Sequence, residues 1–150
     1  MPATSEGEEA IFESREVYLP FGKYEFPLKS YYLEESRELL CVTELGIAKY
    51  SFGELKTKLV GFFPCESQER IKFLTMEQSL RYLVYAGTRG LFGLIEIAKM
   101  NHVFKFSLAD SSPVSLHALP KPNVYAVTYG NHQIHKVDLN KFKKSPGKQP

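Results

Sequence analysis

The sequence predicts an all-β fold built from three repeats of the same antiparallel unit. Two observations carry this prediction: paired hydrophobic runs joined by a short turn occur three times, and their turn glycines are almost evenly spaced. Gly46, Gly90 and Gly130 lie 44 and 40 residues apart. The composition agrees, because aromatic and β-branched residues favour pleated, half-buried surfaces, and the 150 residues include nine Tyr and eleven Phe.

The first unit is predicted over residues 30–64. Its longest apolar run, residues 39–43, is nearly uninterrupted, which is typical of a strand buried on both faces. The turn at Gly46 leads into a further strand, and the last strand alternates enough to leave one face in water. The strands of this unit are expected at 31–33, 39–43, 47–52 and 55–60.

The second and third units, residues 71–108 and 113–140, repeat this order. Strands are expected at 71–74, 80–86, 91–97 and 102–106 in the second unit, and at 114–119, 124–129 and 133–139 in the third. The stretch 91–99 has helical spacing, but Gly90 and Gly93 disfavour a helix there.

The two ends of the chain differ from the repeats, which occupy residues 15–140 in this interpretation. Residues 1–14 are predicted to be a disordered acidic leader, and residues 141–150 a basic disordered tail. Residues 16–28 carry two prolines among aromatics. Because proline cannot donate to a strand ladder, this segment is predicted to be an edge strand or a clamp that packs its Tyr and Phe against the first unit.

Bulk properties restrict the class of protein. The net charge of +2 is too small to favour a nucleic acid or a membrane as partner, and no apolar run approaches the roughly 20 residues needed to cross a bilayer. The acidic N-terminus is unlike a secretory signal. Two cysteines, Cys41 and Cys65, are too few for a disulfide framework. The cytosol or the nucleus is therefore the expected location.

The spacing and the strand order indicate a β-propeller, because a blade has four short strands and repeats every 40–45 residues or so. Residues 80–140 resemble WD40 repeats in particular. That family shows an apolar strand, a small polar turn and then Ile-x-x-(apolar)-Asp, and Ile134, Val137 and Asp138 match this pattern. Val137 stands where the family usually has Trp, and the family's Gly-His pair is missing. The resemblance implies that Asp138 fixes a turn by hydrogen bonds.

Three units are fewer than the roughly 4–8 blades that close a propeller. Either the chain is a fragment or short isoform of a longer propeller protein, or another copy or a partner completes the ring. A β-sandwich or small barrel is the third arrangement, and the first is favoured. An open arc would leave apolar faces without partners, so self-association is also expected.

No catalytic, cofactor or metal site can be assembled from these residues. His132, His135 and Asp138 form the one cluster of His and carboxylate, but 132 and 135 would point to opposite faces of a strand. No nucleophile elbow is present, and the glycine-rich stretch 87–93 lacks the Gly-Lys-Ser/Thr of a phosphate loop. The chain is accordingly predicted not to be an enzyme.

The predicted function is a non-enzymatic scaffold or adaptor that binds other proteins through the turns of its blades. Four residues in or near such turns are the expected contact surface: Arg37, Arg89, Lys121 and His132. The alternative is a small nucleic-acid-binding β domain that would use the basic tail together with strand aromatics such as Tyr82 and Tyr85.

Overall fold

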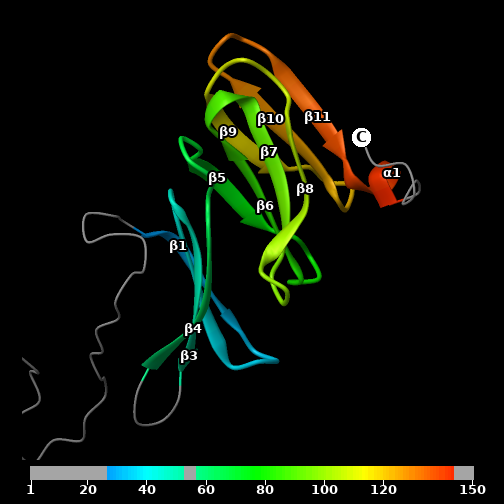
Figure 1. Ribbon diagram of the computed structural model, residues 1–150. Helices are drawn as coiled ribbons and strands as arrows, with labels where there is room; N and C mark the ends of the chain where they lie inside the picture. Colours follow the sequence, from blue (N-terminus) through cyan, green and yellow to red (C-terminus); the bar gives the residue numbers. More distant parts are fainter. Residues whose placement is uncertain (1–26, 53–56, 144–150) are drawn as a thin grey trace, which may run out of the picture.

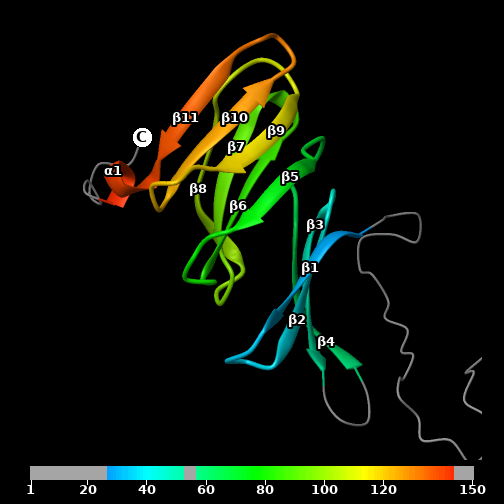
Figure 2. The same cartoon turned by 180° about the vertical axis from the view of Figure 1, so that it is seen from behind.

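Three antiparallel sheets follow one another along the chain and lie in a row in space (Figures 1 and 2). The computed structural model describes residues 27–52 and 57–143. The predicted acidic leader and nearly all of the proline-containing segment 16–28 lie outside the described residues. No helix in the described part is long and apolar enough to cross a membrane.

The strands of each sheet follow sequence order. The first sheet contains β1 (Pro27–Leu33), β2 (Glu38–Thr43), β3 (Gly46–Phe52) and β4 (Thr57–Pro64). The second contains β5 (Ile71–Met76), β6 (Tyr82–Gly87), β7 (Leu91–Glu96) and β8 (Asn101–Ser107). The third contains β9 (Pro113–Ala118), β10 (Val124–Tyr129) and β11 (Ile134–Asp138), with β10 in the middle. Two short helices, η1 (Thr88–Gly90) and α1 (Leu139–Lys143), complete the elements.

The prediction of an all-β repeat fold is confirmed, and the third unit differs from the other two. Its sheet has three strands among the described residues, because the chain turns into α1 directly after Asp138. The Asp138 carboxylate accepts a hydrogen bond of 2.9 Å from the Asn140 backbone N–H, which is the turn-fixing role that the sequence implied. The predicted tail therefore begins within a helical turn, and residues 144–150 lie outside the described residues.

Two hydrophobic cores join the sheets pairwise. Successive side chains of a strand point to opposite faces, so β6 supplies both cores. Leu83 and Tyr85 pack toward the first sheet, whereas Val84 and Ala86 pack toward the third. This double burial explains the nearly continuous apolar run of β6. The first core also contains Leu40, Val42, Ile47, Ile71, Leu91, Ile95 and Ile97, and the second Phe92, Leu94, Phe104, Tyr125, Val127, Tyr129 and Leu139.

Because consecutive strands are antiparallel, the connections between them lie alternately at the two opposite ends of the sheets. We call the end with the β2–β3, β6–β7 and β10–β11 turns the upper rim; it lies at the top of the second and third sheets in Figure 1. The β4–β5 and β8–β9 connections lie at the same end, as shown by the backbone hydrogen bonds Thr88 N–H to Arg70 O and Gly130 N–H to Ser112 O. The β1–β2, β5–β6, β7–β8 and β9–β10 turns form the lower rim.

Candidate functional site

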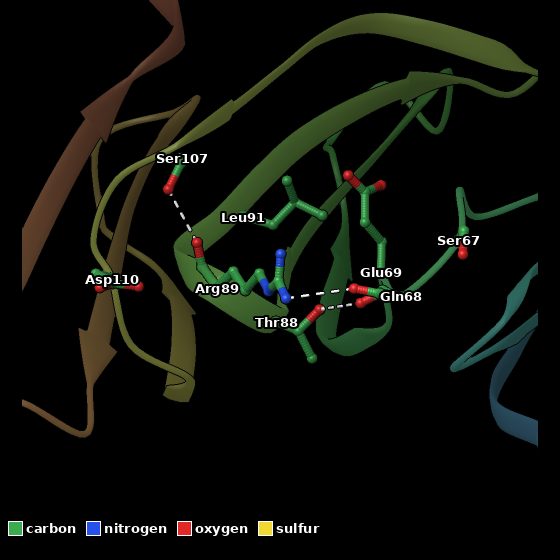
Figure 3. A pocket seen from close by; sticks show the side chains of 8 residues that line it. All are labelled: Ser67, Gln68, Glu69, Thr88, Arg89, Leu91, Ser107 and Asp110. Carbon is green, nitrogen blue, oxygen red and sulfur yellow. Dashed lines mark hydrogen bonds between the residues drawn. The ribbon is translucent and has the colours of Figure 1, made fainter.

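The upper rim of the second sheet holds a pocket of about 380 Å³ that is open to solvent (Figure 3). The β6–β7 turn forms one wall, and the connections that lead into and out of the sheet form the others. The lining residues are Ser67, Gln68, Glu69, Thr88, Arg89, Leu91, Ser107 and Asp110. Seven of these eight have polar or charged side chains.

Arg89 lies at the centre of the β6–β7 turn with an exposed side chain. Its backbone has φ 60° and ψ 35°, which is the left-handed region that residues with a Cβ rarely occupy. The Ser107 hydroxyl donates a 2.9 Å hydrogen bond to the Arg89 carbonyl oxygen. The guanidinium Nη2 donates to Oε1 of Gln68 at 3.3 Å, so the side chain is directed toward the pocket (Figure 3).

Gly90 makes this turn possible. Its φ is 72°, and a Cβ at this position would lie 1.6 Å from the carbonyl oxygen of Ala109. The Gly90 carbonyl oxygen accepts two hydrogen bonds, from the Leu108 backbone N–H at 2.7 Å and from the Tyr129 hydroxyl at 3.2 Å. Because Tyr129 belongs to the third sheet, the turn that carries Arg89 is fixed by two sheets at once.

Thr88 binds the β4–β5 connection, which forms another wall of the pocket, to the β6–β7 turn. Its Oγ1 accepts a 3.0 Å hydrogen bond from the Arg70 backbone N–H, and its own N–H donates to the Arg70 carbonyl oxygen at 3.0 Å. Reciprocal bonds of this kind hold the β4–β5 connection against the β6–β7 turn. Gln68, which receives the Arg89 hydrogen bond, is carried by that connection.

Below the pocket an ion pair links β8 to the β4–β5 connection. The Lys105 ammonium lies 3.0 Å from Glu69 Oε1 and 3.3 Å from Glu66 Oε1. Burial lowers the pKa of Lys105, but the hydrogen bonds and charges of the two glutamates outweigh it and leave that pKa raised. The amine therefore stays protonated at neutral pH and serves as a structural tie.

The chemistry of the described groups around the pocket favours binding. Burial, with a further contribution from Glu69, raises the pKa of the Cys65 thiol to about 11, so this thiol is protonated and a weak nucleophile at neutral pH. Among the described residues no group of three or more His, Cys, Asp or Glu side chains is placed to hold a metal ion. Hydrogen-bond donors and acceptors at an exposed rim are suited to recognising a polar segment of another molecule.

The four residues expected to form a contact surface lie at two different rims. Arg89 and His132 belong to the β6–β7 and β10–β11 turns of the upper rim, whereas Arg37 and Lys121 belong to the β1–β2 and β9–β10 turns of the lower rim. Within the described residues they therefore form two pairs rather than one surface. His132 and Arg37 share the left-handed backbone of Arg89, with φ values of 71° and 58°.

Gln68 and Ser107 were missed by the sequence reasoning, which examined turns within units, and Thr88 was passed over beside Arg89 in one of those turns. The available signal was the polar composition of the connections between the units, which return to the same rim as Arg89. The strand aromatics of the nucleic-acid alternative do not form a platform. Tyr85 is 2% exposed in the first core and Tyr82 packs against the second, on the opposite face of β6.

Comparison with known proteins shows the fold. No family model matches the chain, and no curated protein matches it. One similar solved structure is the β-propeller domain of Cps50 (Swd1) from Myceliophteria thermophila. The TM-score is 0.53 at 12% identity, over 66% of this chain and 33% of that one. Another is a chain in the crystal structure of an active polycomb repressive complex 2 in the basal state. There the TM-score is 0.57 at 10% identity, over 73% of this chain and 26% of that one.

The chain thus has a β-propeller-like fold of three blade-like sheets, as the sequence predicted. It spans about a third and about a quarter of these two chains, respectively. The described sheets form an arc that does not close on itself, so the alternative of a closed sandwich or barrel is not the arrangement observed.

Proposed function

We propose that this chain is a non-enzymatic protein-interaction module, a scaffold or adaptor, whose contact surface is the upper rim around Arg89. The observation that carries the proposal is the conformation of this residue. An exposed arginine is kept in a left-handed backbone by bonds from two sheets, and its guanidinium is held at the mouth of a pocket. Strain retained at an exposed, well-supported position is typical of functional surfaces.

The expected partner is a protein segment that presents carboxylates or free carbonyl oxygens. A guanidinium has five N–H donors in a planar fork, and only one contact with Gln68 is made within the pocket lining. Asp110 and Ser107, on the side of the pocket away from Gln68, add a carboxylate acceptor and a hydroxyl group. A polar extended segment would match this mixture better than an apolar helix.

A protonated Cys65 thiol and the polar pocket support binding over catalysis. The cytosol or nucleus is the proposed location, in keeping with two free cysteines among the described residues. It stays a prediction that a partner also completes the propeller ring. It likewise stays a prediction that the chain is part of a longer propeller protein.

The test compares turn variants that remove a side chain without disturbing the backbone. Glycine adopts a positive φ at no steric cost, so Arg89→Gly, His132→Gly and Arg37→Gly are all expected to fold with unchanged or slightly raised stability. Partners captured from cytosolic and nuclear extracts by the unaltered chain are quantified. The double variant Arg89→Gly/His132→Gly should retain about a tenth or less of the captured partner, because arginines at interface centres often dominate affinity.

The lower-rim variant Arg37→Gly is the matched control, since it loses the same charge from the same backbone conformation. It should capture the partner as well as the unaltered chain does. Equal capture by all variants would show that the upper rim is not the contact surface. Loss with Arg37→Gly alone would transfer the interaction to the lower rim.

A further inference from the structure

Among the described residues the third sheet has one strand fewer than the other two, and its outermost strand shows the difference. In the first and second sheets the third strand, β3 or β7, is buried along most of its length and is paired on both sides. β11 holds the same place in the third sheet, but in the described part of the chain it pairs with β10 alone, and none of its five residues is buried. It lacks the fourth strand that covers its two counterparts.

The free edge of β11 presents the backbone groups of Ile134 and Lys136. In an antiparallel pair only every second residue exchanges hydrogen bonds with the partner strand. The Tyr129 N–H donates to the Gln133 carbonyl oxygen at 2.9 Å, and the register between β10 and β11 has no shift. The odd-numbered residues of β11 therefore bond to β10. The N–H and C=O groups of Ile134 and Lys136 point outward, where an added strand would bond to them.

The residues that follow β11 are used in a helical turn instead of a β-hairpin. The Leu139 N–H donates to the Asn123 carbonyl oxygen at 2.8 Å, and the Leu139 side chain is buried in the second core. Nδ2 of Asn140 donates to the Pro122 carbonyl oxygen at 3.0 Å. These contacts hold the start of α1 against the β9–β10 turn, so the chain leaves the edge of β11 uncovered at this point.

The edge of β11 is positively charged. Lys136 is exposed, and in the part of the chain that the structure describes no carboxylate lies within ion-pair distance of it. Desolvation alone would raise the pKa of Asp138, but hydrogen bonds from Asn140 and the charges of Lys121 and Lys141 leave that pKa lowered. Three lysines therefore lie at or near this edge, and its one carboxylate already has partners.

We propose that β11 binds an acidic, extended segment of a partner protein as the fourth strand of the third sheet. Backbone hydrogen bonds supply affinity in strand addition, and alternate side chains supply specificity. On the core side the added strand lies beside Val137 and beside His135, whose ring meets Tyr129 edge-on at 5.6 Å, so apolar residues fit there. On the other side it lies beside Ile134 and Lys136, where an acidic residue forms a cross-strand ion pair. A second copy of this chain would bring the same lysines and match less well.

Peptide binding tests the charge preference. The probe is a short fluorescein-labelled peptide in which Val alternates with Glu, and its counterpart has Lys in place of Glu. Anisotropy is measured with the full chain at a concentration where it is monomeric. The chain should bind the acidic peptide and not the basic one. Lys136→Glu should weaken binding of the acidic peptide by about fivefold or more and permit binding of the basic peptide.

Lys58→Glu is the matched control, because it makes the same change on β4, the outermost strand of the four-stranded first sheet. It should leave the binding of both peptides unchanged. Equal weakening by Lys58→Glu, or no binding of the acidic peptide to the unaltered chain, would overturn the proposal. The edge of β11 is separate from the pocket at the upper rim, so loss of binding at one would leave binding at the other intact.

Hydrogen exchange of single amides, followed by NMR, tests strand addition itself. In the free chain the N–H groups of Ile134 and Lys136 should exchange fast, whereas those of His135 and Val137 should exchange slowly because they bond to β10. The acidic peptide should slow exchange at Ile134 and Lys136 by about tenfold or more. Binding of the peptide without this protection would overturn the proposal, since charge attraction alone would explain it.

Two other occupants of the edge are distinguished by the same measurements. Slow exchange at Ile134 and Lys136 in the free monomer would overturn the proposal by showing that another part of this chain already pairs with β11. Self-association that persists when the acidic peptide is added would also overturn it, because a second copy would then be the preferred fourth strand.

Discussion

Glycines at equivalent turns of the three units have different physical roles. Gly46 and Gly90 have positive φ values of 151° and 72°, whereas in the third unit the left-handed position belongs to His132. At Gly130 an added Cβ would meet the nearest atom, the Ser111 hydroxyl oxygen, at 3.5 Å, which is ordinary contact. The even spacing of the three glycines therefore marks the repeat, while only the local backbone decides which of them can be replaced.

Gly90→Ala is expected to be strongly destabilising and Gly130→Ala nearly neutral. At position 90 the new methyl group would collide with the Ala109 carbonyl oxygen, and the backbone would have to move away from Leu108 and Tyr129. The expected loss in free energy of unfolding is about 3 kcal/mol or more for Gly90→Ala and within about 0.5 kcal/mol for Gly130→Ala. Urea denaturation of the two variants measures both, and similar losses would contradict this account.

At the scale of elements, His102 on β8 joins strands of two sheets. Its Nε2 lies 2.6 Å from the Tyr85 hydroxyl on β6, and its ring meets Phe63 of β4 edge-on at 5.1 Å. Burial raises the pKa of Tyr85, so this hydroxyl is the donor and neutral His102 the acceptor. Burial, and next the charge of Lys105, lowers the pKa of His102 from 6.5, although Glu69 and Glu66 act in the opposite direction.

Because this hydrogen bond requires neutral His102, we expect the free energy of unfolding to fall in mildly acidic solution. Because the folded state holds His102 below its ordinary pKa of 6.5, the unfolded chain binds more protons as the pH drops through 6.5 and below. The contribution of neutral His102 to the free energy of unfolding is therefore fully present above pH 6.5. It is lost as the pH falls from 6.5 to the lower pKa that His102 has in the folded state. Urea midpoints at about pH 5 and about pH 7.5 should differ less in His102→Gln than in the unaltered chain.

The matched control is His117→Gln, because His117 is exposed on β9 and lies in a different sheet. Its urea midpoints should keep the full difference between the two pH values. If His102→Gln kept the same difference as well, groups other than His102 would be responsible for it.

At the scale of the whole molecule, the two ends of the arc differ. The outer face of the first sheet is free of charge along its central rows, whereas the outer face of the third sheet includes His117, Lys136 and the 72% exposed Ile134. Among the described residues β11 pairs with β10 alone, so its other edge has free backbone groups. Self-association of the kind the sequence predicts would therefore start at β11.

Ile134→Lys is expected to weaken concentration-dependent association of the chain, because it removes the exposed apolar side chain and adds a charge to this edge. The unfolding free energy should change by no more than about 0.5 kcal/mol, since the residue is largely exposed. Sedimentation velocity over a range of micromolar concentrations measures the effect. Val60→Lys, an exposed position on β4 of the first sheet, is the control and should leave association unchanged.

Much of the fold could be predicted because each repeat is marked by local sequence patterns, namely apolar runs and the turn residues between them. The apolar run at 39–43 predicted a strand buried on both faces, and β2 does place Leu40 and Val42 in the first core and Cys41 in a separate buried cluster. Cys41, in the middle of that run, is buried with Ala48 and Tyr50. The candidate site could be predicted less fully, since Arg89 and Arg37 were both expected in strand-connecting turns, and only the structure shows that these turns lie at opposite rims.

The sequence by itself determined that this protein is a series of antiparallel units, because side-chain alternation and turn glycines act over a few residues and leave a readable period. Only the tertiary structure decided which connections share a rim, and so brought Gln68 and Ser107 to Arg89. It also decided that one outer face is apolar and the other is not. Such features depend on contacts between residues tens of positions apart, and no local pattern in the chain records them.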